Sequence, residues 1–321
     1  RAPARALVLT TLAMLLAAFP LALWQADVHQ QPFAGYGALA WAVFALLGVR
    51  SLWCLRGGQD RVALAAQFSW WLLWPSVVSL ACMWLADRFA LAQGWSLALA
   101  LLPWLLVAAT ALLRWPWLAM PLGARFDVLR TALAATLFGV LGVSWLCVLV
   151  QPASPAPLPW LPLLNPMELA QLAVLALAAR WLWSAPAPAG LRGRRVPVLA
   201  IAGFALLTST TLHTVHHWGA VPWNDALWSS TLAQTSLTVV WSVLGVISWV
   251  WGSRRGQRTL WLVGAVLMGV VLAKLVLIDR QHLGNLLGIS SFIAYGLLCT
   301  VVGYLAPAPP RAPDATVESQ S

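Results

Sequence analysis

Residues 94–113 read GWSLALALLPWLLVAATALL, twenty residues without one charged side chain. A helix rises about 1.5 Å per residue, so this stretch is about 30 Å long, the thickness of the hydrocarbon core of a bilayer. It therefore predicts a transmembrane helix. Stretches of similar length and apolar character recur along the chain. The predicted spans, ten in all, cover approximately residues 6–24, 37–55, 62–85, 94–113, 131–150, 167–184, 196–216, 229–251, 259–279 and 288–306.

The composition of the whole chain agrees with this prediction. Of its 321 residues, 61% are hydrophobic and 9% are charged, and the mean hydropathy is +0.81. Soluble domains carry roughly 25% charged residues. So few charges exclude a soluble globular protein, a disordered chain and a disulfide-stapled secreted domain. The predicted fold class is all-α, a polytopic transmembrane helical bundle. The four cysteines lie inside apolar stretches and are predicted to be free thiols.

The basic residues predict the orientation, because short loops rich in Arg and Lys stay in the cytoplasm. With the N-terminus inside, the outer segments hold only Arg88 and Arg280, and the spans hold Arg50, Arg180 and Lys274. The remaining cations lie on the inner side: Arg1, Arg5, Arg56, Arg61, Arg114, Arg125, Arg130, Arg192, Arg194, Arg195, Arg254, Arg255, Arg258 and Arg311. This bias predicts an N-in, C-in topology. Many of the 22 tryptophans lie near span ends, as in an interfacial aromatic belt.

The domain organisation is predicted to be simple. Residues 1–306 form a single transmembrane domain, and residues 307–321 form a disordered, Pro-rich cytoplasmic tail. Because the sequence begins with Arg1, we expect a fragment of a longer protein. Residues 1–26 resemble a signal peptide, but their apolar run is long enough to span, so a membrane helix is favoured. The loop of residues 114–130 mixes Trp, Pro and Arg and is expected to lie along the headgroups.

Histidines mark the predicted outer side. His213, His216 and His217 are spaced i, i+3, i+4, so they share one face of a helix. Two imidazoles on successive turns permit metal binding, which makes His213 and His217 weak metal candidates. No known metalloenzyme motif is present, and the favoured interpretation is a set of interfacial histidines bonded to neighbours or water. No metal and no cofactor are predicted.

Polar residues within the later spans extend this candidate site. The two spans on either side of residue 223 are predicted to form an antiparallel hairpin, in which Gln234 lies near the depth of His213. Lys274 is a cation inside a span, which is a functional-site hypothesis by default. Lys274 either snorkels outward or pairs with another span. Asp279 and His282 follow on a predicted outer loop. Together with His216 and His217, these residues form a candidate polar cleft on the outer face. The alternative is interhelical hydrogen bonding without a ligand.

Four segments of the later half carry a resemblance: PLPWLPLLNPMELAQ (157–171), HTVHHWGAVPW (213–223), RRGQRTLWLVGA (254–265) and KLVLIDRQHLGNLLGISSFIAYGLLCTVVGYLAPAPP (274–310). In order and spacing they resemble the C-terminal portion of the bacterial predicted membrane protein family catalogued as domain of unknown function 2339. The chain departs from that pattern at Arg280 and Gly288. The resemblance implies a bacterial multi-pass membrane protein of uncharacterised function, placed in the cytoplasmic (inner) membrane.

Three function classes remain. The chain is a transport-like protein using the polar cleft, an envelope structural component, or a membrane-embedded enzyme acting on a lipid or glycan intermediate at the outer face. No nucleotide-binding or hydrolase motif is present, so a non-enzymatic role is favoured. The expected partners are membrane lipids, with anionic headgroups on the cytoplasmic side. No nucleic-acid partner is expected, and no protein partner is identified.

Overall fold

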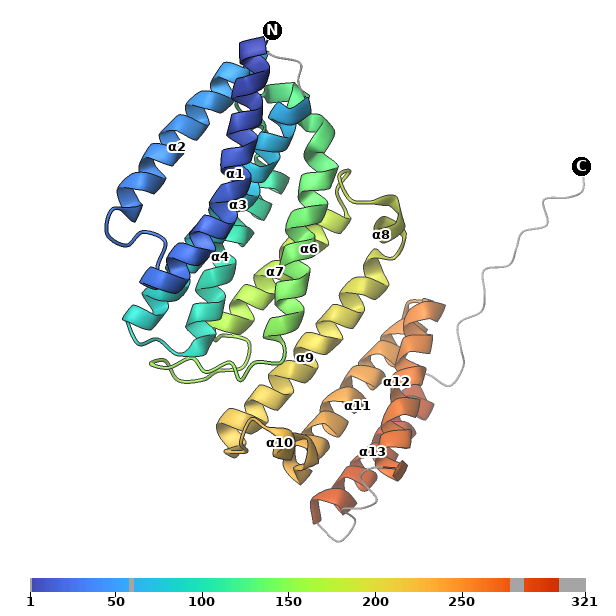
Figure 1. The fold of residues 1–321 in the computed structure, drawn as a ribbon. Coiled ribbons are helices and arrows are strands. Elements are labelled where there is room, and N and C mark those ends of the chain that lie inside the picture. Colours follow the sequence, from blue (N-terminus) through green and yellow to red (C-terminus); the bar gives the residue numbers. More distant parts are fainter. Residues whose placement is uncertain (1, 58–60, 278–285, 306–321) are drawn as a thin grey trace, which may run out of the picture. The chain divides into compact units, whose positions relative to one another are not determined.

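The fold is built from apolar helices. The structure, a computed structural model, describes residues 2–57, 61–277 and 286–305, and these residues contain no β-strand. The ten long helices are α1 (Ala2–His29), α2 (Gly37–Cys54), α3 (Arg61–Arg88), α4 (Gln93–Leu113), α6 (Arg130–Val148), α7 (Pro166–Leu182), α9 (Arg195–Gly219), α11 (Thr231–Arg254), α12 (Arg258–Leu277) and α13 (Leu286–Leu305). Each overlaps one predicted span, which confirms the all-α prediction (Figure 1).

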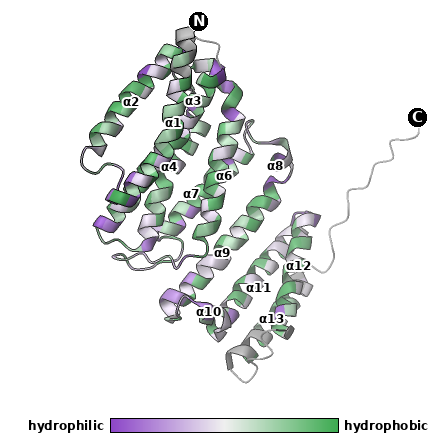
Figure 2. Cartoon of the chain, in the orientation of Figure 1, coloured by the Kyte–Doolittle hydropathy of each residue, from purple (hydrophilic) through white to green (hydrophobic). Residues whose placement is uncertain are grey.

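Short helices connect them. These are α5 (Trp115–Ala119), α8 (Ala189–Gly193), α10 (Asp225–Ser229) and the 3-10 helices η1 (Leu55–Gly57) and η2 (Gly123–Leu129). Within the described ranges, eight helices are long and apolar enough to cross a membrane. Figure 2 shows that hydrophobic residues follow the lengths of the helices and that hydrophilic residues gather near their ends. The count of ten spans and the orientation stay predictions.

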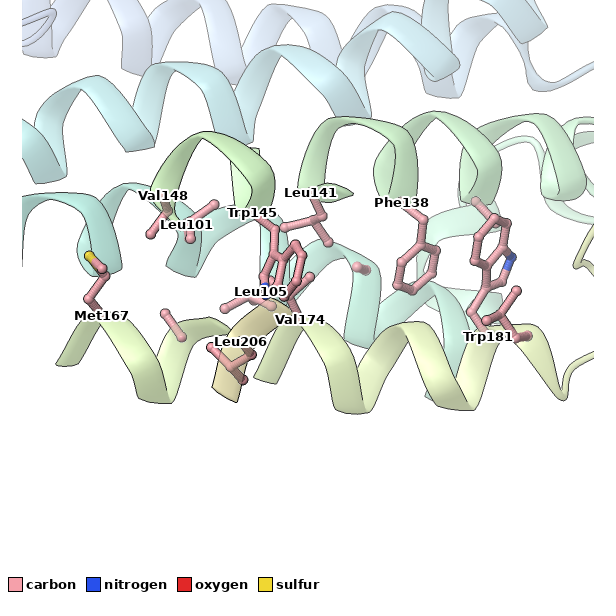
Figure 3. Packing of buried hydrophobic residues seen from close by; sticks show 14 of the residues in the cluster. Leu101, Leu105, Phe138, Leu141, Trp145, Val148, Met167, Val174, Trp181 and Leu206 are labelled. Atoms are coloured by element: carbon pink, nitrogen blue, oxygen red, sulfur yellow. The ribbon is translucent and has the colours of Figure 1, made fainter. Parts of the chain in front are cut away.

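The chain divides into two compact units, Arg1–Leu206 and Leu207–Ser321. In the first unit, α3 packs against α1 and α4, and α4 packs against α6 and α7. Figure 3 shows buried side chains of α4, α6 and α7 between these helices, with Phe138 stacked on Trp181 at 4.5 Å between ring centroids. Large apolar side chains also cover the outside, such as Leu46 at 73% exposure, as a lipid environment requires.

The loop of residues 114–130 differs from expectation. It forms α5 and η2 and buries Leu118 and Phe126 against α3, α4 and α6 instead of only lying along headgroups. The fully buried Gln67 of α3 holds it, because its amide nitrogen donates to the carbonyls of Leu118 at 2.7 Å, Ala119 at 3.0 Å and Met120 at 3.1 Å. One glutamine amide therefore bonds three carbonyls at the C-terminal end of α5, where helical partners run out, and Trp71 Nε1 also donates to the Leu118 carbonyl at 2.9 Å.

In the second unit, α11 and α12 form a tightly packed antiparallel hairpin. Gly256, at φ +65°, ends α11 in the left-handed conformation that favours glycine. A Cβ atom on Gly252 would lie 2.3 Å from the backbone nitrogen of Trp261, and one on Gly264 would lie 2.4 Å from the backbone nitrogen of Trp249. The two backbones thus approach through glycines, as membrane helices commonly do.

Gly264→Ala should disrupt this hairpin, because the added methyl group meets backbone that has no room to move. We expect a loss of about 1–3 kcal/mol of unfolding free energy, the usual cost of overpacking, measured by thermal unfolding in detergent. Gly269→Ala in the same helix is the matched control, since its Cβ would meet nothing within 4 Å. Equal stability of the two variants would contradict the close contact.

Gln67→Ala should release residues 118–122 from α3. The Ala119 and Met120 carbonyls lose this donor, while the Leu118 carbonyl keeps Trp71 Nε1 at 2.9 Å, so we expect a cost of about 1–3 kcal/mol and faster proteolysis within this segment. The control is Gln93→Ala, which removes an exposed side-chain hydrogen bond to Gln151. If Gln67→Ala is cleaved no faster than the control, Gln67 does not hold the segment.

Candidate functional site

Lys274 is a buried cation of the second unit. It lies in the last turn of α12 and is 8% exposed. Its Nζ donates to the backbone carbonyl of Gln234 at 3.0 Å and to the hydroxyl oxygen of Thr238 at 2.7 Å, both on α11. The Thr238 hydroxyl donates in turn to the Gln234 carbonyl at 2.9 Å. Of the two alternatives for Lys274, the structure therefore favours contact with another span over snorkelling.

The packing of α12 against α11 places this cation beside α11, where its side chain comes within hydrogen-bond distance of Thr238. Ammonium groups are costly at membrane depth unless oxygen atoms replace water around them. The Gln234 carbonyl and the Thr238 hydroxyl supply two such oxygens. The side-chain amide of Gln234 points elsewhere and donates to the Trp228 carbonyl.

The histidines gather around Trp223. His213 is fully buried, and its ring stacks on the indole of Trp223 with 4.9 Å between centroids. Its Nε2 lies 3.5 Å from the Ser209 hydroxyl oxygen, one turn earlier on α9. The His216 ring meets the same indole edge-on at 5.6 Å and lies 4.6 Å from the His217 ring. Trp223, one of the tryptophans near the predicted span ends, is thus the centre of this group.

Local sequence explains why the chain folds back here. The helix α9 ends at Gly219, and Ala220 follows in the left-handed region at φ +52°. His216 Nδ1 lies 2.7 Å from the Val221 carbonyl oxygen, which closes the turn. This returns Trp223 onto the histidine face of α9.

The predicted site residues therefore fall into two groups of contacts. One contains Lys274 with Gln234, and the other contains His213, His216 and His217. An apolar cluster that includes Leu212 and Leu237 packs α9 on α11. Trp241 also donates to the Thr208 hydroxyl at 3.1 Å, which adds a polar contact between these helices. Asp279 and His282 lie outside the described residues. The open cleft itself stays a prediction.

The metal candidates have no supporting ligand set in the part of the chain that the structure describes. No group of three or more His, Cys, Asp or Glu side chains there could hold a metal ion. His213 faces Trp223, whereas His217 packs beside His216. All four cysteines are free thiols, as predicted.

A second buried polar group lies in the first unit and was not among the predicted site residues. Asn165 caps α7 by accepting a hydrogen bond from the Glu168 nitrogen at 2.9 Å, and the Glu168 carboxylate accepts one from the Leu163 nitrogen. Glu168 and Gln171 are fully buried. The sequence signal was present, because Asn-Pro followed by Glu two residues later is a helix-start pattern. This pattern indicates that Asn165 and Glu168 stabilise the start of α7, which is a structural role.

Comparisons with known proteins place the chain in a family. No curated protein and no solved structure matches it. The family model described as "Predicted membrane protein (DUF2339)" matches residues 1–309, so the similarity extends well before the segments that first indicated it. This match and the apolar helices establish a multi-pass membrane protein. The chain therefore belongs to the family of predicted membrane proteins called DUF2339.

Proposed function

We propose that this protein is a non-enzymatic, transport-like protein of the bacterial cytoplasmic membrane, and that its second unit binds a polar solute in a cleft near the predicted outer end. The observation that supports the proposal is Lys274, a cation held inside a span with 8% exposure. Ionisable residues at such positions are rare in membrane helices and mark solute or ion pathways.

The chemistry of Lys274 favours a solute with an anionic or strongly accepting group. An ammonium group offers three donors and no acceptor. The oxygens of Gln234 and Thr238 that contact its Nζ are neutral acceptors. The Trp223 indole, which follows α9 and stacks on His213, would add an aromatic wall.

The enzymatic alternative has less support. A catalytic histidine must reach the substrate, but His213 is fully buried and covered by the Trp223 indole. The envelope structural role would use the same polar contacts only to join helices, at about 0.6 kcal/mol per pair. The uptake assay with Lys274→Met distinguishes transport from these two roles.

We also propose the predicted N-in, C-in orientation, with the inner face meeting anionic headgroups. Four cation–π pairs support it: Arg56 with Trp53, Arg130 with Trp115, Arg195 with Trp183 and Arg255 with Trp251, at 4.9–5.5 Å. Every arginine among them belongs to the predicted inner set. Such pairs hold charge and indole together at the headgroup level, where each Arg contributes about 1 kcal/mol toward anionic lipid.

Lys274→Met should abolish solute uptake while the protein still folds, because it removes the charge and keeps the length of the side chain. Proteoliposomes would be tested with radiolabelled acetate, inorganic phosphate and chloride, and we expect uptake of at least one by the unchanged protein. Leu272→Met is the control, since Leu272 is 47% exposed on the same helix. No uptake of any probe would contradict the transport-like role. Equal uptake by both variants would contradict the role of Lys274.

Alkaline phosphatase fusions should report the orientation, since the enzyme is active only after export. A fusion after Leu158 should be active and one after Gly190 inactive, because the positive-inside bias puts the two loops on opposite sides. Colony colour and enzyme assays on whole cells provide the measurement, with immunoblots to equalise expression. The reverse pattern of activity would overturn the proposed topology.

A further inference from the structure

A long apolar groove runs between α1 and α2 in the first unit. Its volume is about 900 Å³, and its walls include Met14, Ala17 and Leu21 on α1 and Val43 and Leu47 on α2. Figure 1 shows α2 standing apart from α1 along much of its length. Both helices are candidate membrane spans, so the groove lies at the depth of the hydrocarbon core.

The helix α3 keeps this groove open, because α1 and α2 each pack on it. Phe44 of α2 stacks on Trp70 of α3 with 6.1 Å between ring centroids. A Cβ atom on Gly48 would lie 2.3 Å from the Trp70 ring, so α2 approaches α3 closely at that point. Trp41, which is 5% exposed, packs edge-on against Trp74 and forms part of the groove lining. The groove is therefore a feature of rigid aromatic packing.

Polar groups occur at the two ends of the groove. Gln25 and Tyr36 lie at one end, and Thr10, Thr11 and Ser51 lie at the other. The Gln25 side-chain oxygen accepts a hydrogen bond from Trp41 Nε1 at 3.2 Å. From Thr10 to Gln25 the helix rises about 22 Å. Apolar walls between polar ends match the profile of a lipid, whose tail is apolar and whose headgroup is polar.

The chemistry of the groove favours acyl chains as the occupant. Its volume is about 900 Å³ along a rise of about 22 Å, and its walls between the polar ends are apolar. Flexible chains can follow such walls, and a second helix from this or another protein is the alternative that the tests below distinguish. Unfilled space would forfeit dispersion contacts along both walls.

We propose that the groove between α1 and α2 is a binding site for the acyl chains of one resident membrane phospholipid. The headgroup lies at one polar end, and the chains lie against Trp41, Phe44 and the aliphatic walls. This site is independent of the polar site in the second unit.

Photo-crosslinking tests the site in the full chain. Nanodiscs of phosphatidylethanolamine and phosphatidylglycerol would include a phosphatidylethanolamine with a diazirine in its acyl chain, and adducts would be mapped by mass spectrometry. Leu47 lines the groove and Leu46, its neighbour, does not, although their exposures are 56% and 73%. We expect adducts to concentrate on Leu47. Equal labelling of both residues would show ordinary surrounding lipid and overturn the proposal.

Groove-filling variants give the second test. Ala17→Phe with Ala40→Phe places two rings in the groove, whereas Ala13→Phe with Ala38→Phe places them on exposed positions that do not line it. Native mass spectrometry should find about one retained phospholipid per unchanged chain. Retention should fall at least about tenfold in the groove variant, which corresponds to an affinity about tenfold weaker. It should persist in the control. Unchanged retention, or crosslinked protein dimers through the groove, would contradict a resident lipid.

Discussion

Within the hydrocarbon layer, no water is present to bond a backbone amide or carbonyl, and this constraint governs the structure. Helices satisfy these groups internally, which is why apolar stretches such as residues 94–113 become helices. Where the backbone leaves regular helix, other backbone groups or side chains must bond it. Gln67 does so for three carbonyls of one short segment, and Asn165 does so at the start of α7.

The same constraint decides how polar side chains are arranged. Lys274 finds the oxygens of Gln234 and Thr238 on the neighbouring helix α11. Thr238 accepts from the ammonium group and donates to the Gln234 carbonyl of its own helix. These contacts thus depend on the packing of α12 against α11.

Sequence reasoning predicted the helices well and their contacts poorly. Hydrophobic length and charge bias are properties of a segment, so each long helix could be located from composition alone. The stacking of Trp223 on His213 depends on a left-handed turn at Ala220, a residue without a strong turn preference. The burial of residues 114–130 depends on Gln67, about fifty residues earlier. Such long-range pairings leave no periodic signal in one sequence. The sequence identifies Lys274 as an unusual residue within a span, but it does not predict which residues of α11 bond it.

The hydrogen bonds from Gln67 to residues 118–120 also have a consequence for synthesis, because the donor precedes the acceptors in the chain. The chain leaves the ribosome from its N-terminus, so α3 is inserted before the segment that it receives. The three carbonyls therefore meet a donor that is already in the membrane when they emerge. No later part of the protein is needed to satisfy them. A segment rich in Pro and Trp can in this way dock as it is made.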